Sequence, residues 1–91
     1  MISRIGVQPV IASMGGAAGR QTYRVAEIVE GEEAEPSNDV SCTNDLSVEG
    51  NFNIVHWSGE AELFRIYRAT GGIFEMIAET AESRFIDVGE E

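Results

Sequence analysis

Few side chains in this sequence are of the kinds that carry out catalysis. His56 is the only histidine and Cys42 the only cysteine, so the chain offers no cluster of zinc ligands and no intramolecular disulfide. The carboxylates of Glu60 and Glu62 could exchange protons, but such pairs arise by chance among 16 acidic residues. We therefore expect no enzyme, no metal site and no cofactor. His56 is predicted to be a surface residue of a strand, and Cys42 a small buried apolar side chain.

Two loop-like stretches also lack the features of ligand-binding loops. Residues 15–19 are rich in glycine, but a phosphate-binding P-loop ends in Gly-Lys-Ser/Thr and this chain contains no lysine. The acidic residues 32–37 lack the spacing of oxygen ligands found in calcium-binding loops. Both stretches are predicted to be solvated connections.

The charge of the chain excludes two classes of partner. Its 16 acidic residues against six arginines give a net charge of -10, which would repel phosphate backbones and anionic lipids. We therefore expect neither nucleic acid nor a membrane surface as a partner. Gln8, Pro9 and Ser13 interrupt the apolar N-terminal stretch, so no signal peptide is expected.

The pattern along the chain is typical of an all-β protein. Short stretches rich in β-branched and aromatic residues alternate with turn residues, among them Glu30-Gly31 and Gly71-Gly72. The predicted strands cover residues 22–29, 38–43, 52–57, 63–69, 73–80 and 84–88, with a short edge strand around 46–48. A chain of 91 residues makes one domain. We expect an antiparallel β-sandwich.

The N-terminal residues form a separate part in this interpretation. Residues 2–11 are predicted to be an extended arm or an edge strand, because Pro9 disfavours both a helix interior and a central strand. Residues 1–20 thus comprise the arm and the glycine-rich loop, and residues 21–91 the single sandwich domain.

The alternation of side chains separates a core from an outer surface. Within residues 52–57, Val55 and Trp57 share one face, whereas Phe52, Ile54 and His56 share the other. This second face is unusually apolar for a sandwich exterior, so either the N-terminal arm covers it or it faces a partner. The predicted core consists of Tyr23, Val25, Val55, Trp57, Phe64, Ile66 and Phe85.

Several short motifs together carry a family resemblance. They are Tyr23, Val25 and Ile28; Gly31, Glu33, Pro36 and Ser37; Val55 and Trp57; Phe64, Ile66, Tyr67, Arg68, Gly71 and Gly72; and Phe85 and Asp87. In these positions residues 22–88 resemble fibronectin type III repeats, in particular the divergent repeats of bacteriophage virion proteins. The resemblance implies an immunoglobulin-like sandwich in which Trp57 is the core tryptophan and Tyr23 anchors a corner of the sixth strand.

One residue departs from the family pattern. Glu27 stands where such repeats have a small apolar residue, so the inner face of its strand is expected to end early or open to solvent.

The order of these motifs is not the usual one. Residues 23–43 resemble the last two strands of a repeat, and residues 46–88 the first five. A cut between the fifth and sixth strands, with the old ends joined through Asn44-Asp45, would still give a closed, circularly permuted sandwich, which we favour. The alternative is that each half is completed by a neighbouring chain, which would make the protein an obligate oligomer.

The resemblance implies a structural role. The expected function is that of a virion structural or accessory protein that binds capsid, connector or tail proteins. Its expected location is the virion, after assembly in the host cytoplasm. Homo-oligomers are expected if neighbouring chains complete each half of the sandwich. The candidate interface residues are Ile2, Ile5, Val10, Phe52, Ile54, Leu63, Arg65, Tyr67 and Arg68. The alternative is a carbohydrate-binding or adhesion module, for which Phe52, Tyr67 and Phe74 are the available aromatic rings.

Two groups of charged residues have more than one interpretation. Arg65 and Arg68 flank Tyr67, and exposed arginine–tyrosine patches are typical interface anchors. Equally, these arginines could pair across strands with Glu79 and Glu75. Asp87 is expected to accept backbone hydrogen bonds at the end of a strand.

Overall fold

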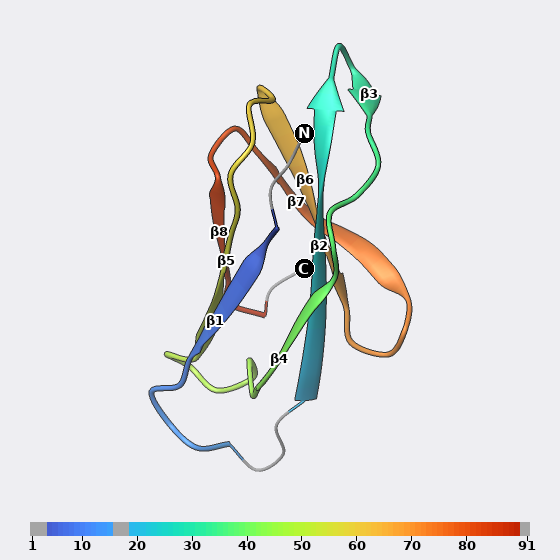
Figure 1. The fold of residues 1–91 in the computed structure, drawn as a ribbon. Coiled ribbons are helices and arrows are strands. Elements are labelled where there is room, and N and C mark those ends of the chain that lie inside the picture. Colours follow the sequence, from blue (N-terminus) through green and yellow to red (C-terminus); the bar gives the residue numbers. More distant parts are fainter. Residues whose placement is uncertain (1–3, 16–18, 90–91) are drawn as a thin grey trace.

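The computed structural model describes residues 4–15 and 19–89. This part of the chain contains eight β-strands and no helix, and the strands form two antiparallel sheets packed face to face (Figure 1). The structure therefore agrees with the prediction of an all-β sandwich. Because no helix occurs among the described residues, none is present that could span a membrane.

The smaller sheet has three strands. It consists of β1 (Gly6–Val10), β5 (Phe52–His56) and β8 (Arg84–Asp87), in the order β1-β5-β8. Residues directly opposite each other on neighbouring strands point to the same face of the sheet. Gln8 lies opposite Ile54, and Ile54 lies opposite Ile86, so these three side chains share one face.

The larger sheet has five strands around a long central one. That central strand is β2 (Gly19–Val29), which pairs on one side with β6 (Leu63–Ala69), followed by β7 (Phe74–Thr80). Its other side pairs with β3 (Glu32–Glu33) and β4 (Val40–Asn44). Glu30 and Gly31 form the β2–β3 turn with φ angles of 53° and 82°, as type I′ hairpins require.

The prediction of a strand around residues 46–48 is wrong, because this segment is a turn. The side chain of Asp45 accepts a hydrogen bond from the backbone N–H of Ser47 (3.1 Å). The backbone carbonyl of Asp45 accepts one from the backbone N–H of Val48 (3.3 Å). These local bonds replace strand pairing. β1 occupies the edge of β5 instead. Of the two predictions for the N-terminal residues, an extended arm or an edge strand, the edge strand is therefore confirmed for Gly6–Val10.

The core lies between the two sheets. Tyr23, Val25, Val55, Trp57, Phe64 and Ile66 are buried there, and Phe85 packs against them partly buried. The rings of Trp57 and Phe64 meet edge to face with centroids 5.4 Å apart. Burying each large apolar side chain stabilises the fold by about 1.5–3 kcal/mol, so this cluster is the main contact between the sheets.

Two residues are buried where the sequence suggested exposure. Ile5 is only 4% exposed and belongs to the core, so it is not available as an interface residue. Glu27 is 6% exposed, and its carboxylate lies beside Gly59. The inner face of β2 therefore does not open to solvent at Glu27, because the loop between β5 and β6 covers it.

Candidate interaction surfaces

The outer face of the three-stranded sheet carries an apolar patch. Val10 lies opposite Phe52, Ile54 lies opposite Ile86, and Val88 lines a hollow together with Phe52. Ile86 and Val88 are 43% and 49% exposed, and the other three are partly exposed. We call these five residues the apolar face. They form it because alternation along β5 and β8 sends Asn53, Val55, Phe85 and Asp87 inward and their neighbours outward.

The apolar face has a basic and an acidic end. At one end Gly6, His56 and Arg84 form a row across the strands, and the imidazole of His56 lies over Gly6, where a Cβ would be 2.5 Å from its Cε1 atom. At the other end Glu49 lies in the turn that lines the hollow beside Phe52. Neither Arg84 nor Glu49 forms an ion pair with another described residue.

The outer face of the five-stranded sheet is organised by paired charges. Arg65 forms ion pairs with Glu79 (3.0 Å) and Glu33 (3.4 Å), and the hydroxyl of Tyr67 donates a hydrogen bond to Glu33. This hydrogen bond raises the pKa of Tyr67, because ionisation would place two negative charges side by side. Leu63 lies on this surface beside Ile28. We call this surface the charged face.

A second set of contacts on the charged face surrounds Arg24. Its guanidinium makes two hydrogen bonds to Asp39 (2.9 and 3.0 Å) and lies 3.7 Å from the centroid of the Phe74 ring. One cation thus satisfies a carboxylate and covers an aromatic ring.

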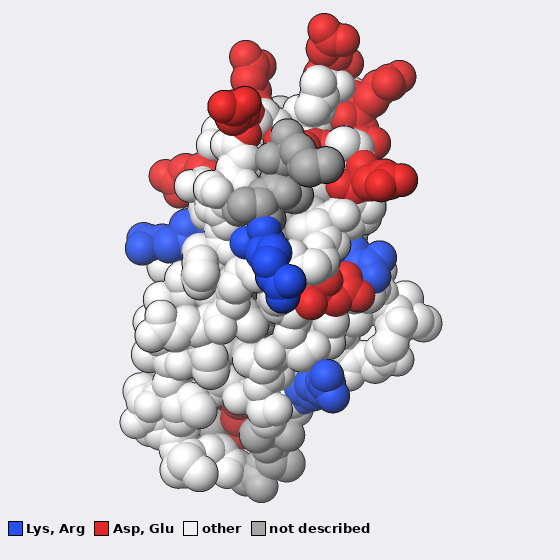
Figure 2. All heavy atoms as spheres, in the orientation of Figure 1, with Lys and Arg blue, Asp and Glu red and all other residues white. Residues whose placement is uncertain are grey.

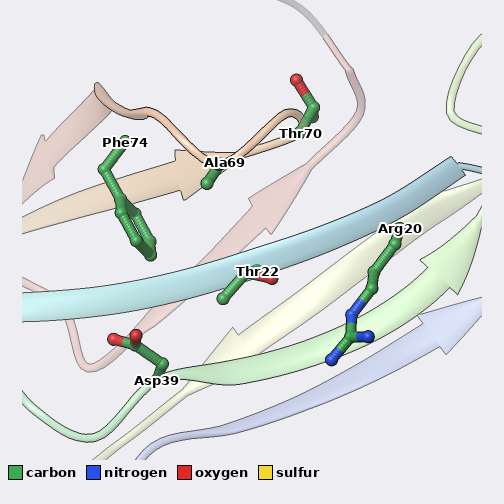
Figure 3. A pocket seen from close by; sticks show the side chains of 7 residues that line it. Arg20, Thr22, Asp39, Ala69, Thr70 and Phe74 are labelled. Atoms are coloured by element: carbon green, nitrogen blue, oxygen red, sulfur yellow. The ribbon is translucent and has the colours of Figure 1, made fainter.

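Next to this contact the charged face is hollowed. Arg20, Thr22, Asp39, Ala69, Thr70 and Phe74 line the hollow, and Figure 3 shows Thr22 between Phe74 and Arg20. The small side chains of Thr22 and Ala69 leave the space, and the hydroxyls of Thr22 and Ser41 are hydrogen-bonded at 2.8 Å. Arg20 forms no ion pair with another described residue.

A buried polar network joins the two sheets beneath these surfaces. Tyr23 on β2 donates its hydroxyl hydrogen to Asp87 Oδ2 on β8 (2.5 Å). Arg68 donates to both oxygens of Asp87 (2.7 and 2.9 Å), and the backbone N–H of Gly89 donates to Oδ1 (2.9 Å). Asp87 is 1% exposed, so its charge depends on these three donors. The expectation that Asp87 accepts a backbone hydrogen bond is confirmed.

The network continues through side-chain amides. Asn53 Nδ2 donates to the hydroxyl oxygen of Tyr23 (2.8 Å) and to Gln21 Oε1 (3.1 Å), while Asn44 Nδ2 donates to Asn53 Oδ1 (2.9 Å). Burial raises the pKa of Tyr23 far above its usual range, and Asp87 adds to that shift. Burial also raises the pKa of the half-buried Cys42 thiol. These groups are held neutral and hydrogen-bonded, which suits a structural role.

The predicted interface residues are distributed over different surfaces. Val10, Phe52 and Ile54 belong to the apolar face, whereas Leu63, Arg65 and Tyr67 lie on the charged face. Arg65 pairs with Glu79, as one of the two interpretations required. Arg68 is not an exposed anchor, because its side chain is 9% exposed and turned inward to Asp87. Ile2 lies outside the described residues.

Sequence reasoning missed two kinds of residue. Ile86 and Val88 extend the apolar face, and their alternation with Phe85 and Asp87 was sufficient to find them. Asn44 and Asn53 in the network had no comparable pattern, because polar residues in strands usually face water.

Known proteins offer no assignment of either surface. No group of three or more histidine, cysteine, aspartate or glutamate side chains that could hold a metal ion occurs within residues 4–15 and 19–89. Comparisons of the chain with protein-family models, curated proteins and solved structures give no match.

Proposed function

We propose that this chain is a non-enzymatic structural or accessory component of a virion, which binds other virion proteins through its apolar face. The observation that carries the proposal is the patch of partly and fully exposed apolar side chains that β1, β5, β8 and the adjacent Val88 present on one face of the small sheet. Contiguous apolar surface on a soluble domain is costly to leave in water and typically marks a binding site. The family resemblance supplies the virion as the setting.

The sheet layout supports the immunoglobulin-like part of the proposal. In such sandwiches strands A, B and E share one sheet, and strands C, F and G the other. β1, β5 and β8 would then be A, B and E, while β6, β2 and β4 would be C, F and G. In this assignment the chain runs A, F, G, B, C, E, with β7 between C and E. This order is not a simple circular permutation, because strand A comes first and strands F and G lie between A and B. Both sheets come from one chain, which favours a sandwich that closes within a single chain over one whose halves are completed by neighbouring chains.

Copy number in purified particles tests the proposed function. The particles to examine are those encoded by the genome that carries this chain, with quantitative mass spectrometry as the measurement. We expect a defined copy number for the natural sequence and a loss of incorporation for Ile54→Asp, because the new carboxylate would be desolvated at the interface. Met76→Asp is the matched control, since Met76 is 55% exposed on β7 of the other sheet. Absence of the natural chain from the particles would refute the proposal.

A second candidate function is the binding of a glycan in the hollow of the charged face. The observation favouring it is the meeting there of an aromatic ring, a guanidinium, a carboxylate and hydroxyl groups (Figure 3). Phe52 lies on the opposite sheet from Tyr67 and Phe74, so the three rings do not form one platform. Glycan-array binding that is lost in both Phe74→Ala and Arg20→Ala would establish this function, and an array without binding would exclude it for the glycans displayed.

A further inference from the structure

We propose that the partner of the apolar face is the same face of a second copy, related by a two-fold axis that lies parallel to the sheet and crosses its strands between Phe52 and Ile54. This inference rests on the proposed use of the apolar face as an interface, and it names the occupant. Such a contact is isologous, so each residue of one copy meets the symmetry-related residue of the other.

The positions of the charges select this axis. Along β5 the basic row at His56 lies two residues beyond Ile54, and the acidic turn at Glu49 lies three residues beyond Phe52. At about 3.3 Å per residue, the basic row is about 10 Å from the midpoint of the apolar face. Glu49 lies beyond the opposite end of β5, in the turn that precedes the strand. A two-fold axis at that midpoint reverses the strand direction and brings Arg84 of each copy toward Glu49 of the other.

The competing arrangement is electrostatically unfavourable. A two-fold axis running along the strands would place Arg84 against Arg84 and Glu49 against Glu49. Arg84 and Glu49 are two charges left without an ion pair among the described residues, so the antiparallel arrangement satisfies both of them at once.

The segregation of the remaining charge favours the same arrangement. Acidic side chains gather at the end of the molecule that carries the β2–β3 hairpin, whereas the surface toward the opposite end is almost free of charge in Figure 2. That acidic end includes Glu30, Glu32, Glu33 and Glu35. In the antiparallel arrangement the β2–β3 hairpins of the two copies point in opposite directions. This separation limits the repulsion between copies that each carry a net charge of -10.

The size of the contact predicts a reversible dimer. Three strands spaced about 4.8 Å apart and four or five residues long make a small interface, below the roughly 800 Å² per partner of stable complexes. We therefore expect a concentration-dependent equilibrium between monomer and dimer.

Sedimentation velocity across a concentration series tests the dimer. Arg84→Glu and Glu49→Arg should each weaken dimerisation about tenfold, because each substitution turns two symmetry-related attractions into repulsions. The double variant Arg84→Glu/Glu49→Arg should restore the affinity of the natural chain, since it only exchanges the signs of the pairs. Met76→Asp should leave the equilibrium unchanged. Circular dichroism and thermal melting of each variant separate lost association from lost folding.

Two results would overturn the inference. One is a monomer at every concentration, and the other is a dimer in which the double variant is no better than the single ones. A monomeric chain that still enters particles, with incorporation lost in Ile54→Asp, would leave the proposed function intact and refute only self-association. A chain that dimerises as described but is absent from particles would refute the virion role and support the dimer.

Discussion

The two outer faces of the sandwich meet water in different ways. On the charged face, Arg65, Tyr67 and Glu33 satisfy one another, and Arg24 pairs with Asp39 while covering Phe74. The apolar face has no such contacts, because its five side chains contain no polar groups. On the charged face the polar groups satisfy one another, although Leu63 and Met76 are exposed there as well. The apolar face has only apolar side chains, which gain free energy when something covers them.

This difference is the reason for proposing the interface on the smaller sheet. Ion pairs exposed to solvent contribute little to stability, about 0–1 kcal/mol each, but they keep a surface soluble and specific. Apolar surface contributes about 25 cal/mol for each Å² removed from water. The charged face therefore has little to gain from a partner, and the apolar face has more.

The two faces can differ in this way only if the sheets are held together from within, and removal of Asp87 should have the largest effect on that contact. Asp87→Ala leaves Arg68 buried without its partner and removes the acceptor of Tyr23. We expect a loss of about 3–5 kcal/mol of unfolding free energy, measured by chemical denaturation. Asp39→Ala, which breaks the exposed pair with Arg24, is the control and should cost less than about 1 kcal/mol. Equal losses in the two variants would show that the network does not hold the sheets.

Alkaline pH should weaken the same network. The pKa of Tyr23 is raised in the folded protein, so the unfolded chain loses this proton first, near pH 10. Above that pH the unfolded state binds fewer protons than the folded state, and stability falls by about 1.4 kcal/mol per pH unit. Below pH 10 the contribution is fully present.

Denaturation at a series of pH values from 8 to 11 measures this slope. Tyr23→Phe should remove the part of the slope that begins near pH 10, whereas the part from the raised pKa of Cys42 begins at lower pH and should remain. Tyr67→Phe should remove little, because Tyr67 is close to the surface. A slope that Tyr23→Phe leaves unchanged would assign the alkaline sensitivity to another group.

Local patterns predicted the sides of strands better than the partners of strands. Val55 and Trp57 were assigned inward and Phe52 and Ile54 outward, because successive side chains in a strand point to opposite faces. The same alternation places Arg68 with Ile66 on the inner face, so the inward turn of Arg68 was available from the sequence.

Long-range pairing was the part that could not be predicted. The edge of β5 could accept either residues 46–48 or the N-terminal segment, and strand propensity does not distinguish the two. The side chain of Asp45 decides the choice by closing a turn, which leaves that edge to β1. The buried amides of Asn44 and Asn53 were missed for a related reason, since their partners come from distant strands.

A single removal on the charged face should have a moderate effect. Glu33→Ala eliminates one ion pair with Arg65 and the hydrogen bond from Tyr67, so we expect a loss of about 0.5–1 kcal/mol in chemical denaturation. Glu32→Ala, on the adjacent residue of the same strand, makes a matched control with no such contacts among the described residues and should cost less. If both variants cost the same, the pairs on the charged face are not what stabilises it.

The smallest change in stability should come from the apolar face, and there it should be accompanied by a clear change in association. Ile86→Thr keeps the β-branch that suits a strand but removes apolar surface from a side chain that is 43% exposed. We expect the unfolding free energy to change by less than about 0.5 kcal/mol, because little buried contact is lost. Retention on a hydrophobic-interaction column should nevertheless fall, and more than for Met76→Thr on the other sheet. A large loss of stability would instead place Ile86 in the core and remove the basis for an interface on this face.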